Sequence, residues 1–307
     1  MRDYLMSYQF AGDQSHIQNS ADGFIQFDWD PSAHWNMIGG LRYDYFSASS
    51  KSRLSAKIGV MYKLNGWRFR TSYAGGFRAP SLKELFMHFN MANVFTIYGN
   101  KNLKPENSDN FQISAEYTHR NYSFSANAFH NIFRNRISTA WNTALNGMNY
   151  LNTAKVRITG LDINAQTRFL CGIGLTASYV YTHENIPMGQ PYTSSTRPHS
   201  AVLRADYDHN FRTWGFNVAL TGRYLSKLST DQYTSATSYT QTQRVTYPDY
   251  QIWRLTAMGR LNRGVRLTMT VDNIFNYKPS YYYINSPTTT GAILSCGLSV
   301  DIDKLIK

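Results

Sequence analysis

The stretch Val265-Arg266-Leu267-Thr268-Met269-Thr270-Val271-Asp272 alternates apolar and polar side chains without a break. Successive side chains of an extended strand point to opposite faces, so a period of two is typical of a strand with one apolar and one polar face. The same alternation recurs in residues 54–62, 111–117, 161–169 and 214–224. The sequence therefore predicts an all-β protein.

About fourteen such strands are expected, and many are long enough for a tilted strand to cross a bilayer, which takes about 9–11 residues. The predicted strands are 1–10, 21–30, 34–46, 52–64, 66–76, 107–119, 121–134, 153–170, 172–184, 197–209, 213–225, 249–261, 264–276 and 291–302. Short turns alternate with long polar connections, and the long ones are 77–106, 135–152, 185–196, 226–248 and 277–290.

Short turns at one end and long loops at the other are typical of outer-membrane barrels. A soluble β-sandwich or jelly roll would explain the alternation, but not the strand length or the sorting of the connections. We therefore expect a transmembrane antiparallel β-barrel with an apolar face toward lipid and a polar face toward the lumen. Because lipid cannot satisfy unpaired backbone groups, strand 1–10 must meet strand 291–302, or both must meet strands from elsewhere.

Composition excludes several other classes. The net charge is +12, charged residues make up 16%, and two cysteines are present. No apolar run reaches about 18 residues, which excludes a helical membrane protein, and two cysteines exclude a disulfide scaffold. The basic residues are spread over strands and loops, so they do not indicate a nucleic-acid partner. Neither zinc-site spacing nor a nucleophile motif is present, and we predict that the chain is not an enzyme.

The connection 77–106 carries local signals for a short helix. Ser81 followed by Glu84 forms a capping box, and four apolar residues then share one helical face: Leu82, Leu85, Phe86 and Phe89. The sequence predicts an amphipathic helix over the mouth of the barrel.

Two boxes in this connection resemble those of a known family. Arg78-Ala79-Pro80 and Asn100-Lys101-Asn102-Leu103 are similar to the FRAP and NPNL boxes of the haem and haemoglobin receptors among TonB-dependent outer-membrane receptors. Lys101 stands where that family usually has proline. Residues 271–276 resemble the penultimate strand of the family, and the resemblance covers essentially the whole chain.

The resemblance implies a plugged barrel of about 22 strands, of which this chain would form the C-terminal part. We therefore expect residues 1–307 to be the C-terminal portion of a receptor barrel or one half of a split receptor, with the plug domain and about eight strands elsewhere. The first residues contain no apolar signal segment. We accordingly expect that a signal has been removed or that the chain begins partway through a longer one.

The resemblance also places a haem-contacting loop at 77–106 and an axial-ligand histidine at His88. Neutral imidazole binds haem iron well. The predicted ligand-binding residues are His88, Arg78, Lys83, Tyr98, Lys101 and Asn102, with His88 as the ligand of the haem iron. As an alternative, His88 pairs with Glu84 on the helix, and the basic residues are solvated or pair with lipopolysaccharide.

The function implied is TonB-dependent uptake of an iron compound, with haem favoured. The alternatives are a cobalamin or siderophore receptor of the same family, a free-standing 14-stranded passive porin, and a surface adhesin. No intrinsic cofactor is expected, haem being the transported ligand. The implied partners are the N-terminal plug and remaining strands, from the same gene or a second chain, the TonB energy-coupling complex through the plug, lipopolysaccharide and outer-membrane lipid, and a surface lipoprotein.

The expected location is the outer membrane of a Gram-negative bacterium, with the long loops extracellular and the C-terminus periplasmic. Within the lumen we expect basic residues to pair with acids: Arg168, Arg204, Arg223, Arg254 and Arg266 with Asp162, Asp206 and Asp272.

Overall fold

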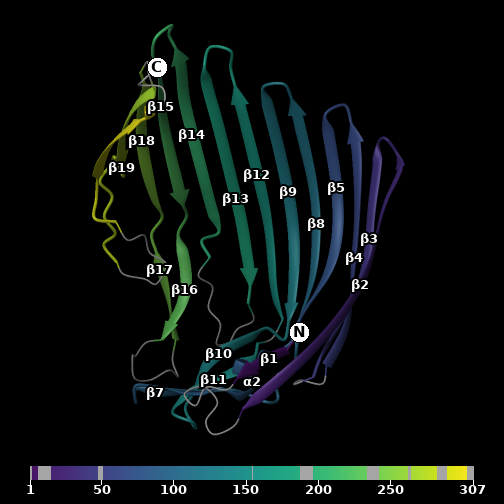
Figure 1. Cartoon of the computed structure of the whole chain (residues 1–307). Helices are drawn as coiled ribbons and strands as arrows, with labels where there is room; N and C mark the ends of the chain where they lie inside the picture. Colours follow the sequence, from purple (N-terminus) through teal and green to yellow (C-terminus); the bar gives the residue numbers. More distant parts are fainter. Residues whose placement is uncertain are drawn as a thin grey trace.

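One large antiparallel sheet dominates the fold. The computed structural model describes residues 2–5, 15–47, 51–153, 155–186, 196–233, 242–261, 264–281 and 289–302. Its main sheet has 14 strands, bonded side by side in chain order (Figure 1). They are β1 (Arg2–Leu5), β2 (His16–Ser32), β3 (Trp35–Phe46), β4 (Lys51–Leu64), β5 (Trp67–Arg78), β8 (Glu106–His119), β9 (Tyr122–Arg134), β12 (Val156–Arg168), β13 (Ile173–Asn185), β14 (His199–Asn210), β15 (Gly215–Leu225), β18 (Tyr250–Arg260), β19 (Val265–Asp272) and β20 (Ile293–Val300). The predicted all-β fold is confirmed.

The predicted strand boundaries differ most at the N-terminal edge. The predicted strand 1–10 corresponds to β1, and residues 6–14 lie outside the described part of the chain. The predicted strand 21–30 begins earlier, because β2 starts at His16. Residues 16–19 are mostly polar and carry no alternation, yet they are extended because they pair with β1.

Short turns connect the strands at one end of the sheet, which we call the short-turn end. Asn65 and Gly66 join β4 to β5 with φ angles of 46° and 86°. Both angles lie in the left-handed region that a two-residue type I′ hairpin requires, and Asn-Gly is the pair that adopts it most readily. The identities of these two residues therefore account for the tight turn between β4 and β5.

The two faces of the sheet differ in polarity as the alternation predicts. Across β18 and β19, Val271 faces Leu255 and Met269 faces Ala257 on one side of the sheet, while Thr270 faces Thr256 on the other. Many large apolar side chains are well exposed, among them Ile113 at 63%. An apolar face of this extent is unsuited to water and fits a lipid environment.

Ion pairs occupy the polar face. Asp206, whose side chain is 7% exposed, contacts Arg168 at 2.7 Å and Arg204 at 3.3 Å. Arg254 forms an ion pair with Asp272. These three predicted pairings are confirmed, and they neutralise charges that line the lumen side.

Three other lumen residues depart from the prediction. Asp162 accepts a hydrogen bond from Asn127 Nδ2 at 3.2 Å and has no arginine partner within the described residues. Arg223 and Arg266 form no ion pair within the same part of the chain. The cause is positional, because no carboxylate stands opposite either arginine on the neighbouring strands.

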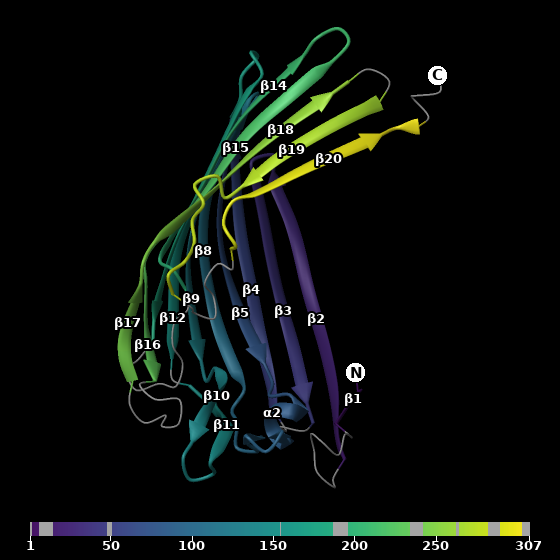
Figure 2. The same cartoon turned by 90° about the vertical axis from the view of Figure 1, so that its left-hand side faces the viewer.

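The main sheet is curved but open. Its two outermost strands are β1 and β20, and they are not bonded to each other (Figure 2). Beyond Asn19, β2 has no strand on its outer side among the described residues, and every residue of β20 is exposed. Of the two expected ways to close the barrel, pairing of strand 1–10 with strand 291–302 is therefore not what the structure shows.

The long connections contain regular structure of their own. They lie at the lower end of the sheet in Figure 1, which we call the long-connection end. A four-stranded sheet, in the order β10-β11-β7-β6, and a two-stranded sheet of β16 and β17 form there. Their strands are β6 (His88–Met91), β7 (Phe95–Tyr98), β10 (Ile137–Asn142), β11 (Gly147–Asn152), β16 (Leu228–Tyr233) and β17 (Thr242–Tyr247).

The predicted helix is present but shorter than expected. Helix α2 covers Leu82–Phe86 and ends before Phe89, which lies in β6. His88 also lies in β6, so the alternative in which it pairs with Glu84 on one helix is wrong. The backbone hydrogen bonds between β6 and β7 keep the chain extended there.

Among the described residues, no α-helix is long and apolar enough to span a membrane.

Candidate functional site

Helix α2 is fixed to the long-connection end by its cap and by a small core. The Ser81 N–H donates to Glu84 Oε2 at 2.8 Å, and the Glu84 N–H donates to Ser81 Oγ at 3.3 Å. This reciprocal pair is the predicted capping box. Beneath it, three buried apolar side chains form a core against which Phe86 and Tyr150 pack: Leu85, Leu103 and Ile137. A short helix is thus stabilised by tertiary packing rather than by its own length.

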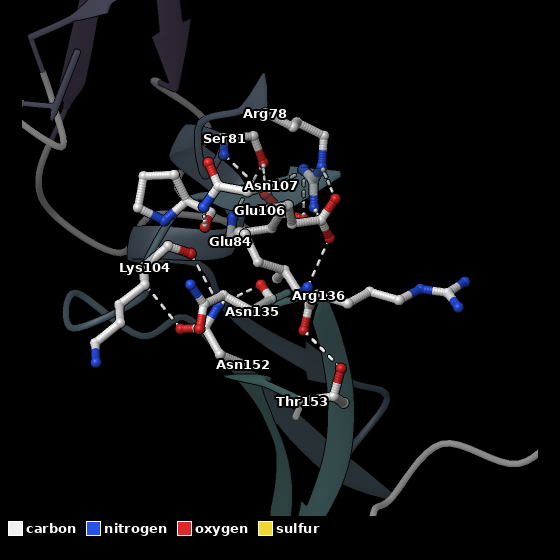
Figure 3. Close-up of polar contacts among 12 residues, drawn as sticks. Arg78, Ser81, Glu84, Lys104, Glu106, Asn107, Asn135, Arg136, Asn152 and Thr153 are labelled. Carbon is white, nitrogen blue, oxygen red and sulfur yellow. Dashed lines mark hydrogen bonds and ion pairs between the residues drawn. The ribbon is translucent and has the colours of Figure 1, made fainter. Parts of the chain in front are cut away.

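Arg78 lies at the centre of a polar cluster (Figure 3). Its Nη1 donates to both carboxylate oxygens of Glu84, at 3.0 and 2.9 Å. Its Nε and Nη2 donate to Glu106, each at 2.9 Å, and Glu106 also accepts a hydrogen bond from the Ile137 N–H at 2.6 Å. One guanidinium therefore connects the helix, the start of β8 and the start of β10.

This cluster lies beyond the part of the strands that a membrane requires. Arg78 and Glu106 are the last residue of β5 and the first of β8, strands of 12 and 14 residues, whereas about 9–11 residues suffice to cross a bilayer. Hydrogen bonding to Glu106 is the main reason that the pKa of Arg78 is raised. Burial raises the pKa of Glu106, but the hydrogen bonds from Arg78 and Ile137 and the charges of Arg78 and Arg136 outweigh it and lower that pKa overall.

The lowered pKa of Glu106 makes the cluster sensitive to acid. A carboxyl whose pKa is lower in the folded state stabilises that state above its unfolded pKa of about 4.3, and this stabilisation is lost as the pH falls through the folded pKa. We therefore expect hydrogen-exchange protection of the Ile137 amide to be constant from pH 7 to about 5 and to fall below about pH 4, after correction for intrinsic rates. Glu106→Gln should be less protected at pH 7 and should lose this acid dependence; an unchanged profile in Glu106→Gln would assign the transition to another group.

A second set of contacts joins the connection that carries both boxes, 77–106, to the connection 135–152. Asn100 Nδ2 donates to the Tyr150 carbonyl at 3.0 Å. The Lys104 N–H donates to Asn152 Oδ1 at 2.7 Å, and Asn152 Nδ2 returns a bond to the Lys104 carbonyl at 2.8 Å (Figure 3). In addition, β7 pairs in parallel with β11. Residues 79–105 and 135–153 therefore form one assembly, which we call the cap assembly.

His88 and Tyr98 face each other in the cap assembly. They are paired residues of β6 and β7, and their rings meet edge to face with 5.2 Å between the centroids. The His88 side chain is exposed and Tyr98 is half-buried. An exposed imidazole held against an aromatic ring can coordinate an iron or accept a hydrogen bond.

The remaining predicted site residues lie on the surface of the same assembly. Lys83 is exposed on α2, and Asn102 is exposed with its N–H bonded to Asn100 Oδ1 at 2.9 Å. Lys101 is exposed, and its Nζ lies 5.6 Å from the ring centroid of Phe86. All six predicted residues thus belong to the cap assembly or its edge, but Arg78 is engaged by two carboxylates while His88, Lys101 and Asn102 face outward.

His16 is the residue that the sequence did not indicate. It is the first residue of β2, and its ring stacks on Phe86 with 3.8 Å between centroids and an angle of 10° between planes. Burial is the larger cause that lowers the pKa of His16, and the charge of Lys101 adds to it. Seventy residues separate His16 from Phe86, and no local pattern around His16 marks it, so the contact is visible in the fold alone.

Together these features define a class of protein: a membrane-spanning antiparallel barrel wall that carries an ordered assembly of loops at one end. A family model described as "TonB dependent receptor-like, beta-barrel" matches residues 2–274, and the chain belongs to this family. The suspected resemblance is thereby confirmed. Membership places the chain in the outer membrane of a Gram-negative bacterium and confirms the prediction that it is not an enzyme.

Individual relatives are distant. The chain is 28% identical over 191 residues to the iron-regulated outer membrane virulence protein of Vibrio cholerae, covering 57% of this chain and 29% of that protein. It is 24% identical over 277 residues to the heme/hemopexin utilization protein C of Haemophilus influenzae, covering 78% of this chain and 38% of that protein. The FrpB iron transporter from Neisseria meningitidis superposes with a TM-score of 0.72 at 16% identity, covering 93% of this chain and 45% of that one. The chain spans less than half the length of these proteins.

Proposed function

We propose that this chain forms part of the wall and the ligand-capturing loops of a receptor that takes up an iron compound, and that the compound is haem. The observation that carries the proposal is His88, an exposed imidazole of the cap assembly that faces Tyr98; the same assembly presents Phe86, with Lys101 over its ring. Imidazole is a ligand of haem iron, aromatic rings suit the face of a porphyrin, and a lysine is a counterion for its carboxylates. The Haemophilus relative named for heme and hemopexin supports the same choice.

In this proposal the long-connection end is extracellular and the short-turn end is periplasmic, as in other outer-membrane barrels. The cap assembly then meets ligands from outside the cell, and lipopolysaccharide surrounds its base. A plug domain in the lumen would pass energy from the TonB complex to the ligand site. A surface lipoprotein that delivers the ligand would dock at the same end.

The open edges of the sheet support a barrel completed by further strands, from the same gene or from a second chain. Each backbone group left unpaired in lipid would cost several kcal/mol, and both β2 and β20 present rows of such groups. This argues against the free-standing 14-stranded porin.

Cys296 is exposed on β20, so its thiol is a native probe of that edge. A cysteine is introduced into the strand expected to lie beside β20, and disulfide formation with Cys296 is measured in outer membranes. A disulfide would identify that strand as the partner of β20.

Growth tests the proposed ligand. A strain that lacks its other haem receptors is supplied with the receptor that contains this chain, in medium without other iron. We expect growth on hemin that requires TonB. Growth on a ferric siderophore but not on hemin, or rescue of cobalamin uptake, would assign the ligand to the alternatives; uptake of small solutes independent of TonB would favour a porin.

A further inference from the structure

We propose that a cationic patch on the lumen side of β4 and β5 is a docking surface for acidic side chains of the plug domain. This inference rests on the proposed function, in which a plug occupies the lumen. The patch consists of Lys57, Lys63, Arg68 and Arg70, all of them exposed. It begins beside the turn at Asn65 and extends along these two neighbouring strands toward the middle of the sheet (Figure 1).

The register of β4 and β5 places the four cations on one face of the sheet. Tyr62 is paired with Phe69 on the apolar side, and the next pair, Lys63 with Arg68, lies on the opposite side. Side chains alternate between the two faces along a strand. The other two cations are an even number of residues away on the same strands, so they share the side of Lys63 and Arg68. This polar side of a barrel wall is the one that faces the lumen.

The patch carries more positive charge than the wall neutralises. Lys63 and Arg68 are directly opposite each other, and like charges in that position destabilise a sheet. Glu116 of β8 contacts both arginines, with 3.1 Å from its Oε1 to Arg68 Nη1 and 3.3 Å from its Oε2 to Arg70 Nη1. Within the described part of the chain, the two lysines form no ion pair, so one carboxylate serves four cations.

Arg70 also has hydrogen-bonding capacity that the wall uses poorly. Its Nε donates to Met61 Sδ at 3.3 Å, and a thioether sulfur is a weak acceptor. Other arginines of the lumen side are better satisfied: Arg168 and Arg204 share the buried carboxylate of Asp206, with closest contacts of 2.7 and 3.3 Å. The patch on β4 and β5 therefore differs from the opposite part of the sheet in lacking carboxylates of its own.

A domain that fills the lumen makes this difference costly unless the domain supplies the missing charges. An open lumen would neutralise the patch with water and mobile ions, but a packed domain displaces both, and a charge that is buried without a partner is strongly destabilising. Surfaces that pack together have complementary charges. We therefore expect aspartate or glutamate side chains of the plug to lie against Lys63 and Arg70.

The experiment is zero-length cross-linking of the assembled receptor in outer membranes. A water-soluble carbodiimide joins an amine to a carboxylate only where the two groups are in contact, and mass spectrometry of the digested receptor identifies the joined peptides. We expect a cross-link from Lys63 to an aspartate or glutamate of the plug. Lys63→Arg keeps the charge and removes the reactive amine, so this cross-link should disappear while the receptor remains assembled.

Charge reversal measures what the contact contributes to seating the plug. In Lys63→Glu the patch should repel the acidic face of the plug, and we expect proteinase K to digest the plug about tenfold faster or more. The difference should narrow at about 1 M salt, where charges are screened within about 3 Å. The matched control is Lys227→Glu, the same charge change at an exposed lysine of the long-connection end.

Two results would overturn the inference in distinguishable ways. If a plug is present but Lys63 couples only to Glu116 or to no carboxylate, and Lys63→Glu is digested like Lys227→Glu, the patch does not dock the plug and the proposed function stands. If the receptor contains no further domain and conducts ions as an open pore, the proposed function fails, and the docking surface fails with it.

Discussion

Gly99→Ala is expected to separate residues 100–103, the second box, from α2 and so to open the cap assembly. A Cβ at Gly99 would lie 2.5 Å from Met87 N, 2.6 Å from Phe86 N and 2.7 Å from Leu85 C. All three are backbone atoms, so no side-chain rotation relieves the clash, and the chain around residue 99 must move away. That movement breaks the bonds from Gly99 N to Met87 O and from Asn100 N to Glu84 O. We expect a local destabilisation of about 3 kcal/mol or more.

Limited trypsin digestion of the membrane-embedded receptor measures this opening. The cap assembly contains trypsin cleavage sites after Lys83, Lys101 and Arg136, and cleavage follows the population of the open form when closing is fast. Cleavage in Gly99→Ala should be faster by on the order of a hundredfold. The matched control is Gly259→Ala in β18, where an added Cβ meets no atom within 4 Å. Equal digestion of the two variants would show that close approach at residue 99 does not hold the assembly together.

His88→Ala is expected to have the largest effect on function. If His88 is the ligand of the haem iron, its loss removes a direct coordination bond and should weaken hemin binding by about tenfold or more, with a matching loss of growth on hemin. The side chain is exposed and contacts Tyr98 at its ring edge, so the fold should tolerate its removal. Trypsin resistance of the cap assembly should therefore stay unchanged.

The control for this prediction is His119→Ala. His119 stacks on aromatic residues at the short-turn end, with Tyr117 at 6.3 Å between centroids, far from the cap assembly along β8. Growth and receptor abundance in outer membranes are compared for both variants. Normal growth on hemin in His88→Ala at equal abundance would remove His88 from the list of ligands.

The strands of the main sheet could be predicted from sequence because their signal is local. Segments such as 265–272 alternate at every residue, and turns such as Asn65-Gly66 carry their own backbone preference. The capping box of α2 was predictable for the same reason, since Ser81 and Glu84 are three residues apart. The strand start at His16 was not, because it depends on pairing with β1 rather than on its own residues.

The internal structure of the long connections could not be predicted because it depends on contacts between distant segments. In these connections β6 pairs with β7 and β10 with β11, and the two hairpins join into one sheet only because β7 pairs with β11 of the other connection. The same holds for the roles of site residues. The sequence marks Arg78 as basic, but its engagement by Glu84 and Glu106 requires the fold, and nothing local marks His16 as a neighbour of Phe86.

The parallel pairing of β7 with β11 has a consequence for how such receptors diverge and can be re-engineered. Ligand preference is often sought by grafting a single loop from one receptor onto another. Here a graft of residues 79–105 alone would remove β7 from the side of β11 and the Lys104 backbone from Asn152. The two connections therefore behave as one structural unit. A sequence change in one connection that disturbs their contacts requires a compensating change in the other. A functional chimera should exchange both connections together.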